Sequence, residues 1–184
     1  MVHTLRLLCT LGYVICSVLS LSGQLILRED SISHPSYLPG FPNQTHFNYL
    51  REKVSPATDA SGNFNGKVML RIHGSAGSSI PLFDLHVPGY SWMDDLALAG
   101  YDVFCMDLVG YGKSFKQAVM DDRCNLSGLD RTTAGATGCS FSAPYDSTLQ
   151  YSISENQEID AVVHHILSYR NVSQLNLLGY SLGG

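Results

Sequence analysis

Three short apolar runs are spaced along the second half of the sequence. "KVMLRIHG" begins at residue 67, "YDVFCMD" at 101 and "QLNLLG" at 174. Runs of this length and polarity are typical of strands buried on both faces of a parallel sheet, and the intervals between them are long enough for helical crossovers. The sequence therefore predicts an α/β fold with a parallel sheet. A chain of 184 residues that is 45% hydrophobic is long enough to bury one sizeable core.

Two helices are expected between these runs. The first covers 91–100, "SWMDDLALAG", with Ser91 as N-cap and Gly100 at the C-terminal end. The second is expected to begin at a capping box formed by Ser154 and Gln157. Its apolar residues fall on one helical face: Ile159, Val162, Val163, Ile166 and Leu167.

The first third of the sequence carries weaker signals. Residues 45–54, "THFNYLREKV", suggest a strand, and residues 55–66 have the Gly, Asn, Asp and Pro content of a turn or loop. The Pro-rich segment 33–47 is expected to run extended over a surface. Residues 115–152 form an irregular insertion that is too long for an ordinary connection, which suggests a functional loop or cap.

The N-terminus has the pattern of a secretory signal peptide. One basic residue, Arg6, precedes an apolar run at 7–21, which is followed by the small residues Ser22 and Gly23. We expect cleavage near residue 23, a secreted product and one partial domain over 24–184. A retained membrane anchor through 7–21 is the alternative, but that run is shorter than the roughly 18 apolar residues that a span needs.

Cysteines and sequons also fit an extracellular protein. Cys124 and Cys139 bracket a Gly/Ser/Thr-rich stretch that lacks periodicity. A disulfide there would contribute about 3 kcal/mol, so we expect the two to pair. Cys105 lies inside an apolar run and is expected to be a buried, unreactive thiol. Three N-x-[ST] sequons are expected to carry glycans: Asn43, Asn125 and Asn171.

Charge and motif spacing argue against several partners. Sixteen acidic and eleven basic residues give a net charge of −5 without a basic block, so nucleic acid is not expected as a partner. No cofactor or metal is implied: His164 and His165 are adjacent and lack the i, i+4 spacing of a metal pair. "GYGKS" resembles the end of a P-loop, but Asp107 stands where that motif needs glycine. The oligomeric state is left open.

The chemistry of the chain is concentrated at 179–183, where Gly-Tyr-Ser-Leu-Gly directly follows the third apolar run. In a G-x-S-x-G pentapeptide the serine sits at a sharp turn between a strand and a helix, and the flanking glycines remove steric collisions. The turn projects the Ser181 hydroxyl above the sheet, beside the unpaired N–H groups of the new helix. A mere helix cap at Ser181 would leave the glycines and the preceding strand unexplained.

Two further motifs lie upstream in a matching order: "RIHGSAG" at 71–77 and "DLVGYGKS" at 107–114. With the pentapeptide, they make residues 67–184 resemble the N-terminal half of an α/β-hydrolase fold enzyme. The motif at 71–77 is similar to the His-Gly oxyanion loop after the third strand, and the motif at 107–114 is similar to the D-x-x-G-x-G-x-S turn after the fourth. The resemblance implies that Asp107 and Ser114 hold their turn together and do no chemistry.

The same resemblance assigns roles at the site. Ser181 would be the nucleophile, and the backbone N–H of Leu182 would be one oxyanion donor. The other donor would be the N–H of Ser75, with that of Ala76 as the alternative. His73 would be a structural residue and not the general base.

The resemblance also implies a catalytic acid and a histidine after the serine, whereas all seven histidines precede Ser181. The third apolar run would be an exposed strand edge, which is an aggregation hazard. We therefore expect an N-terminal fragment or a truncated gene model that ends just after the elbow, and a 184-residue chain that is inactive alone.

The functional expectation is the N-terminal part of a secreted serine hydrolase that cleaves an ester, or less readily an amide, through an acyl-enzyme on Ser181. Its substrate would be a small-molecule or lipid ester. Serine at this position argues against the family's epoxide and haloalkane hydrolases, which use Asp, but peptidase, lipase, lactonase and esterase stay open. The alternatives are a non-catalytic binding protein of this fold and an inactive truncated product.

Overall fold

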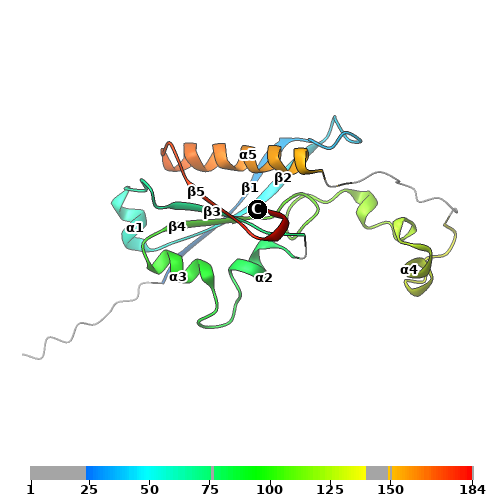
Figure 1. Cartoon of the computed structure of the whole chain (residues 1–184), viewed down its shortest axis with the longest axis horizontal. Helices are drawn as coiled ribbons and strands as arrows, with labels where there is room; N and C mark the ends of the chain where they lie inside the picture. Colours follow the sequence, from blue (N-terminus) through cyan, green and yellow to red (C-terminus); the bar gives the residue numbers. More distant parts are fainter. Residues whose placement is uncertain (1–23, 76, 140–148, 150, 184) are drawn as a thin grey trace, which may run out of the picture.

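The computed structural model describes residues 24–75, 77–139, 149 and 151–183. The strands of this part form one sheet with the order β1-β2-β4-β3-β5 (Figure 1). The strands are β1 (Ile26–Pro35), β2 (Thr45–Val54), β3 (Val68–Ile72), β4 (Asp102–Met106) and β5 (Asn176–Gly179). β3 pairs in parallel with both β4 and β5, as expected for the predicted α/β class.

The sheet also has an antiparallel edge, of which the sequence predicted only one strand. β2 is the strand expected at 45–54, and it pairs antiparallel with β1 on one side and with β4 on the other. β1 was not predicted. Within it only Ile32 and His34 are buried, so the apolar alternation that identifies a strand is missing from its sequence.

The segment expected to be a loop at 55–66 contains a short helix, α1 (Pro56–Ser61). Ser55 caps it, because the Ser55 hydroxyl accepts a hydrogen bond from the Thr58 N–H at 3.1 Å. Proline at the first helical position and glycine at 62, with φ 62°, complete the pattern. The residues that suggested a loop therefore begin and end a helix of 6 residues.

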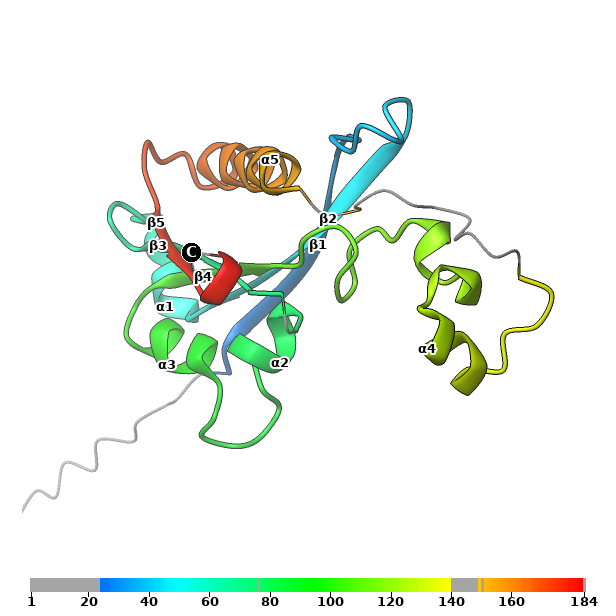
Figure 2. The ribbon, with the colours of Figure 1, turned by 45° about the vertical axis from the view of Figure 1, so that its right-hand side comes forward.

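Helices cover both faces of the sheet (Figure 2). α2 (Ser79–Phe83) and α3 (Trp92–Leu98) lie on one face, and α5 (Ser152–Arg170) lies on the other. Alternate residues of β4 point to opposite faces of the sheet. Phe104 and Met106 pack in the core with α5. Val103 and Cys105 pack in the core with α2 and α3. The free thiol of Cys105 is buried, as predicted.

One of the two predicted helix starts was correct. Ser91 caps α3 by accepting a hydrogen bond from the Asp94 N–H at 3.1 Å. The capping box at Ser154 was wrong, because α5 begins at Ser152 and has Tyr151 as N-cap. The Ser154 hydroxyl instead donates to the Tyr37 carbonyl at 2.9 Å, which ties α5 to the segment after β1.

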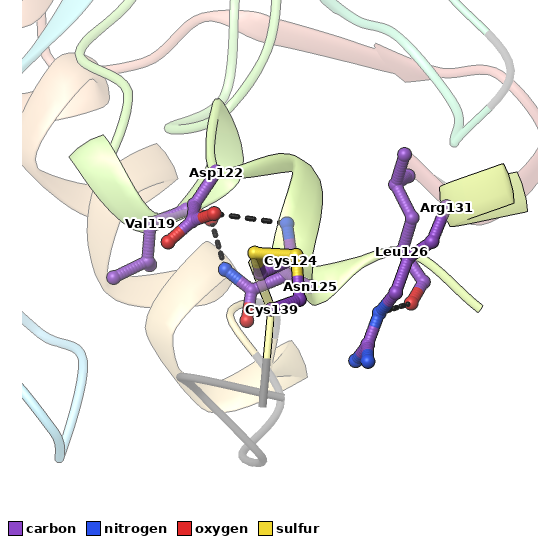
Figure 3. The surroundings of a disulfide bond; sticks show 7 residues. All are labelled: Val119, Asp122, Cys124, Asn125, Leu126, Arg131 and Cys139. Atoms are coloured by element: carbon purple, nitrogen blue, oxygen red, sulfur yellow. Dashed lines mark hydrogen bonds between the residues drawn. A yellow bond between two sulfur atoms is a disulfide. The ribbon is translucent and has the colours of Figure 1, made fainter. Parts of the chain in front are cut away.

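The insertion after β4 projects away from the sheet (Figure 1). It contains η1 (Ala118–Met120), η2 (Arg123–Asn125) and α4 (Gly128–Thr133). The predicted disulfide between Cys124 and Cys139 is present, with their Cα atoms 5.4 Å apart (Figure 3). The Asp122 carboxylate accepts a hydrogen bond from the Cys124 N–H at 2.9 Å beside it. Part of the insertion, at 140–148 and 150, lies outside the described residues.

The predicted signal peptide at 1–23 also lies outside the described residues. Of the helices that the structure describes, none is long and apolar enough to cross a membrane. Two sequon asparagines, Asn43 and Asn171, are exposed. Asn125 is half-buried, and its side-chain amide donates to the Val119 carbonyl at 2.5 Å.

Candidate active site

Ser181 follows the end of β5 in a backbone conformation that is rare for a residue with a side chain. Gly179 lies opposite Ile72 of β3, and the Tyr180 N–H continues the pairing by donating to the Ile72 carbonyl at 3.0 Å. The chain then turns, with φ 56° at Ser181. This is the strained turn that the G-x-S-x-G spacing predicts, and it leaves Ser181 exposed.

Gly183 brings this turn against the loop that follows β3. A Cβ atom at Gly183 would overlap the His73 carbonyl oxygen and lie 2.9 Å from the Ile72 carbonyl oxygen. Because both neighbours are backbone atoms, they cannot move aside as a flexible side chain would. The second glycine of the pentapeptide therefore allows the serine turn to pack directly on the loop that contains Ser75.

His73 has a structural role in this loop. Its ring is buried, and its Nε2 accepts a hydrogen bond from the Leu108 N–H at 3.0 Å. Its Nδ1 lies 2.8 Å from the Gly74 carbonyl, to which it donates. These two bonds require the neutral tautomer with its proton on Nδ1. Both ring nitrogens are thus occupied, and His73 is not placed to take a proton from Ser181.

Ser75, the proposed oxyanion donor, is positioned by a hydrogen bond to its backbone carbonyl. The Tyr111 hydroxyl donates to the Ser75 carbonyl at 3.1 Å, and the Tyr111 ring contacts the His73 ring edge to face at 4.7 Å. These residues line a small pocket together with Gly74, Leu108 and Glu155. The alternative donor, Ala76, lies outside the described residues.

Asp107 fixes the turn after β4. Its buried carboxylate accepts hydrogen bonds from the Ser79 N–H at 2.7 Å and from the Lys113 N–H at 2.8 Å. The Ser114 hydroxyl donates to the Asp107 carbonyl at 2.5 Å. Gly112 has φ 46°, and a Cβ atom there would overlap the Asp107 carboxylate. The D-x-x-G-x-G-x-S motif thus encodes one compact hydrogen-bonded turn beneath the site.

Glu158 of α5 supports the same turn and was not identified from the sequence. Its carboxyl group is buried and accepts hydrogen bonds from the Val109 N–H at 2.8 Å and the Asn48 side-chain amide at 3.1 Å. Burial raises the pKa of Glu158 to about 7, although both hydrogen bonds act in the opposite direction. The available signal was an acid in helical register with the buried Val162 and Ile166.

This raised pKa gives a testable pH dependence of stability. The folded state holds the Glu158 proton more tightly than the unfolded state, so the contribution of the protonated carboxyl is complete below about pH 4.5 and is lost as pH rises through about 7. Glu158→Gln removes this titration. Between pH 5 and pH 8, the fall in the unfolding free energy should therefore be smaller in the variant than in the wild type, by about 2.5 kcal/mol.

Urea unfolding at both pH values measures this difference. Asp160→Asn serves as the matched control, because it removes an exposed carboxylate from the same helix. Equal pH slopes for the wild type and Glu158→Gln would contradict the assigned protonation.

Neither a metal-binding cluster nor a base hydrogen-bonded to Ser181 is found among the described residues. No described residue hydrogen-bonds to the Ser181 hydroxyl, and among the described residues no group of three or more His, Cys, Asp and Glu could hold a metal ion. His164 is exposed and lies 3.3 Å from Asp160, and His165 is partly exposed. The candidate site therefore consists of the Ser181 turn, the loop after β3 and the turn after β4.

Comparison with known proteins identifies the fold family. The model of the alpha/beta hydrolase fold family matches residues 67–184. Similar solved structures include a thioesterase domain from the curacin biosynthetic pathway (19% identity, TM-score 0.45, 86% of this chain and 38% of that one). A predicted hydrolase from Thermoplasma acidophilum is 16% identical with a TM-score of 0.41, over 87% of this chain and 53% of that one. An epoxide hydrolase from Vigna radiata is also 16% identical with a TM-score of 0.41, over 84% of this chain and 32% of that one.

The chain thus spans between 32% and 53% of the length of these three structures. A comparison with curated protein sequences gave no match.

Proposed function

Because this chain belongs to the alpha/beta hydrolase fold family, we propose that Ser181 is the nucleophile of a serine hydrolase that cleaves a carboxylic ester. The observation that carries the proposal is the positive φ of 56° at an exposed serine directly after β5. Such strain is found where a structure holds a group for function. The packing of Gly183 on the His73 carbonyl supports it further, because it places the serine turn against the loop that contains Ser75.

The proposed reaction has two steps. The Ser181 oxygen attacks the ester carbonyl carbon while a general base takes its proton, and the alcohol leaves with that proton. Water then attacks the acyl-enzyme, which releases the acid and restores the serine. In both steps the negative oxygen accepts hydrogen bonds from the N–H groups of Leu182 and Ser75.

The general base must come from outside the described residues. His73 is unsuited to this role because its two ring nitrogens bond to Leu108 and Gly74. In this fold the base follows the nucleophile in chain order. We therefore assign the acid and the histidine to polypeptide other than the described part of this sequence, and propose the activity for the whole protein.

The proposed substrate is a small-molecule or lipid ester, with an amide as a slower alternative. An acyl-enzyme needs a leaving group that departs after proton transfer, and an alcohol departs more readily than an amine. A serine nucleophile also favours acyl transfer over epoxide opening, for which the family uses Asp at this position.

We propose that the protein acts outside the cell. The disulfide between Cys124 and Cys139 supports this location, because such bonds persist in oxidising compartments. The exposed sequons at Asn43 and Asn171 are compatible with glycosylation. Asn171 ends α5 before β5, at the opposite edge of the sheet from Ser181, so a glycan there would leave the site accessible.

Covalent labelling tests the proposed nucleophile directly. A fluorophosphonate probe is incubated with the full-length protein, and the labelled peptide is mapped by mass spectrometry. Labelling is expected at Ser181 and should be absent in Ser181→Ala; the buried Ser114 provides an internal negative control. A folded protein that remains unlabelled would refute the hydrolase proposal and favour a non-catalytic binding protein.

A further inference from the structure

Tyr111 extends from the turn after β4 to the loop after β3. Its hydroxyl donates to the Ser75 carbonyl at 3.1 Å, and its ring contacts the His73 ring edge to face at 4.7 Å. Tyr111 occupies a variable position of the D-x-x-G-x-G-x-S motif, so the motif assigns it no role. Its contacts in the structure place it directly behind the proposed oxyanion donor.

The loop after β3 gives the exposed Ser75 little support of its own. Among the described residues, two hydrogen bonds hold the backbone of Gly74 and Ser75, and both end on carbonyl oxygens. His73 Nδ1 donates to the Gly74 carbonyl at 2.8 Å. The Tyr111 hydroxyl donates to the Ser75 carbonyl. The position of Ser75 therefore depends on two side chains and not on a helix or strand.

These two hydrogen bonds fix the direction of the Ser75 N–H. This N–H shares a planar peptide with the Gly74 carbonyl, and in a trans peptide the two groups point in opposite directions. No cis peptide bond occurs among the described residues. The Ser75 carbonyl belongs to the next peptide plane, so anchoring both carbonyls restricts rotation on each side of the Ser75 Cα. Tyr111 anchors one carbonyl directly and packs on the His73 ring that anchors the other.

The turn that carries Tyr111 is a firm support for this contact. The Tyr111 N–H donates to the Leu108 carbonyl at 3.0 Å, and the Tyr111 carbonyl accepts from the Ser114 N–H at 3.0 Å. Glycines at 110 and 112 flank Tyr111 with φ 94° and 46°. The Tyr111 ring also packs against the core on the α5 side of the sheet. A side chain that is fixed at both backbone and ring can hold its partner precisely.

We propose that Tyr111 is a positioning residue, which aligns the Ser75 N–H for the oxyanion through its hydrogen bond to the Ser75 carbonyl. This inference rests on the proposed function, since it takes Ser181 as the nucleophile. When Ser181 attacks, the ester oxygen gains negative charge and accepts stronger hydrogen bonds from the N–H groups of Leu182 and Ser75. A donor that is already aligned stabilises this charge without first reorganising. Tyr111 touches no reacting atom and transfers no proton.

Tyr111→Phe in the full-length protein tests this role, because it removes the hydroxyl and keeps the ring on His73. Losing an oxyanion donor outright costs about 10² to 10³ in kcat, so misaligning one should lower kcat for p-nitrophenyl butyrate by about tenfold to a hundredfold. KM should stay within about twofold, since the donor acts in the transition state. A trifluoromethyl ketone, which forms a tetrahedral adduct with a serine, should bind more weakly by the same factor as the fall in kcat/KM.

Tyr169→Phe is the matched control. It removes a partly exposed hydroxyl, which donates to Glu52 at 3.4 Å, near the C-terminal end of α5. This variant should keep the kcat of the wild type and its affinity for the ketone.

Three results would contradict the positioning role. If Tyr111→Phe kept the kcat of the wild type while Ser181 was still labelled by the fluorophosphonate, this inference alone would fail. A loss of kcat/KM that lies in KM, or that matches a loss of folded protein by circular dichroism, would assign Tyr111 to binding or folding instead. If the wild type neither hydrolysed the ester nor reacted with the probe, the proposed function and this inference would fail together.

Discussion

Replacing Ser181 with alanine is expected to lower the kcat/KM of the full-length protein for an ester such as p-nitrophenyl butyrate by roughly 10⁴-fold or more. The variant loses the only atom that forms the acyl-enzyme, so no partial reaction through that intermediate remains. Alanine at φ 56° is no less compatible with the turn than serine, and the exposed side chain contributes little packing. The free energy of unfolding should therefore change by less than about 0.5 kcal/mol.

Steady-state rates and urea unfolding, measured on the same preparations, separate these two effects. Ser168→Ala is the matched control, because it removes an exposed serine hydroxyl from α5. It should retain full activity. Activity in Ser181→Ala within tenfold of the wild type would mean that another group is the nucleophile.

The second large effect is expected at Asp107, and it concerns stability. Asp107→Ala leaves the N–H groups of Ser79 and Lys113 without their acceptor, and Ser79 is fully buried. Losing two hydrogen bonds to a buried carboxylate should lower the unfolding free energy by about 3 to 5 kcal/mol. For a domain of ordinary stability, about 5 to 15 kcal/mol, this is a large share of the total.

Asp107→Asn should fall between the wild type and Asp107→Ala, because the amide keeps one oxygen but turns an NH₂ group toward an N–H donor. Asp121→Ala removes an exposed carboxylate from the insertion and controls for loss of charge. Chemical unfolding midpoints rank the four proteins. If Asp107→Ala unfolded at the same urea concentration as Asp121→Ala, the carboxylate would not hold the turn.

The parallel part of the fold was predictable because its signals are local. β3 and β4 are almost wholly buried and lie in mostly apolar runs of sequence, and the Ser91 cap lies next to the helix that it starts. β1 was not predictable in this way. Its position in the sheet comes from pairing with β2 over its whole length. Because most of its residues are exposed, its own sequence does not show the apolar alternation of a strand.

In the candidate site, too, the features set by local sequence were predictable and those set by long-range contacts were not. The Ser181 turn and the roles of the glycines at 112 and 183 could be predicted, because short motifs with fixed spacing are typical of these backbone conformations. Glu158 lies 49 residues from Val109, whose N–H it accepts. A contact of this range depends on how α5 packs against the sheet, and a single sequence does not encode it in any local pattern.

The position of β4 has a consequence for how the chain assembles during synthesis. β4 lies between β2 and β3 in the sheet although it follows both in the chain. The β1–β2 hairpin can form as soon as Val54 has left the ribosome, but β2 and β3 keep unpaired edges until Met106 emerges. At ribosomal rates that interval is roughly 3 to 10 s. A nascent chain halted before residue 102 should therefore be a substrate for chaperones that recognise open strands.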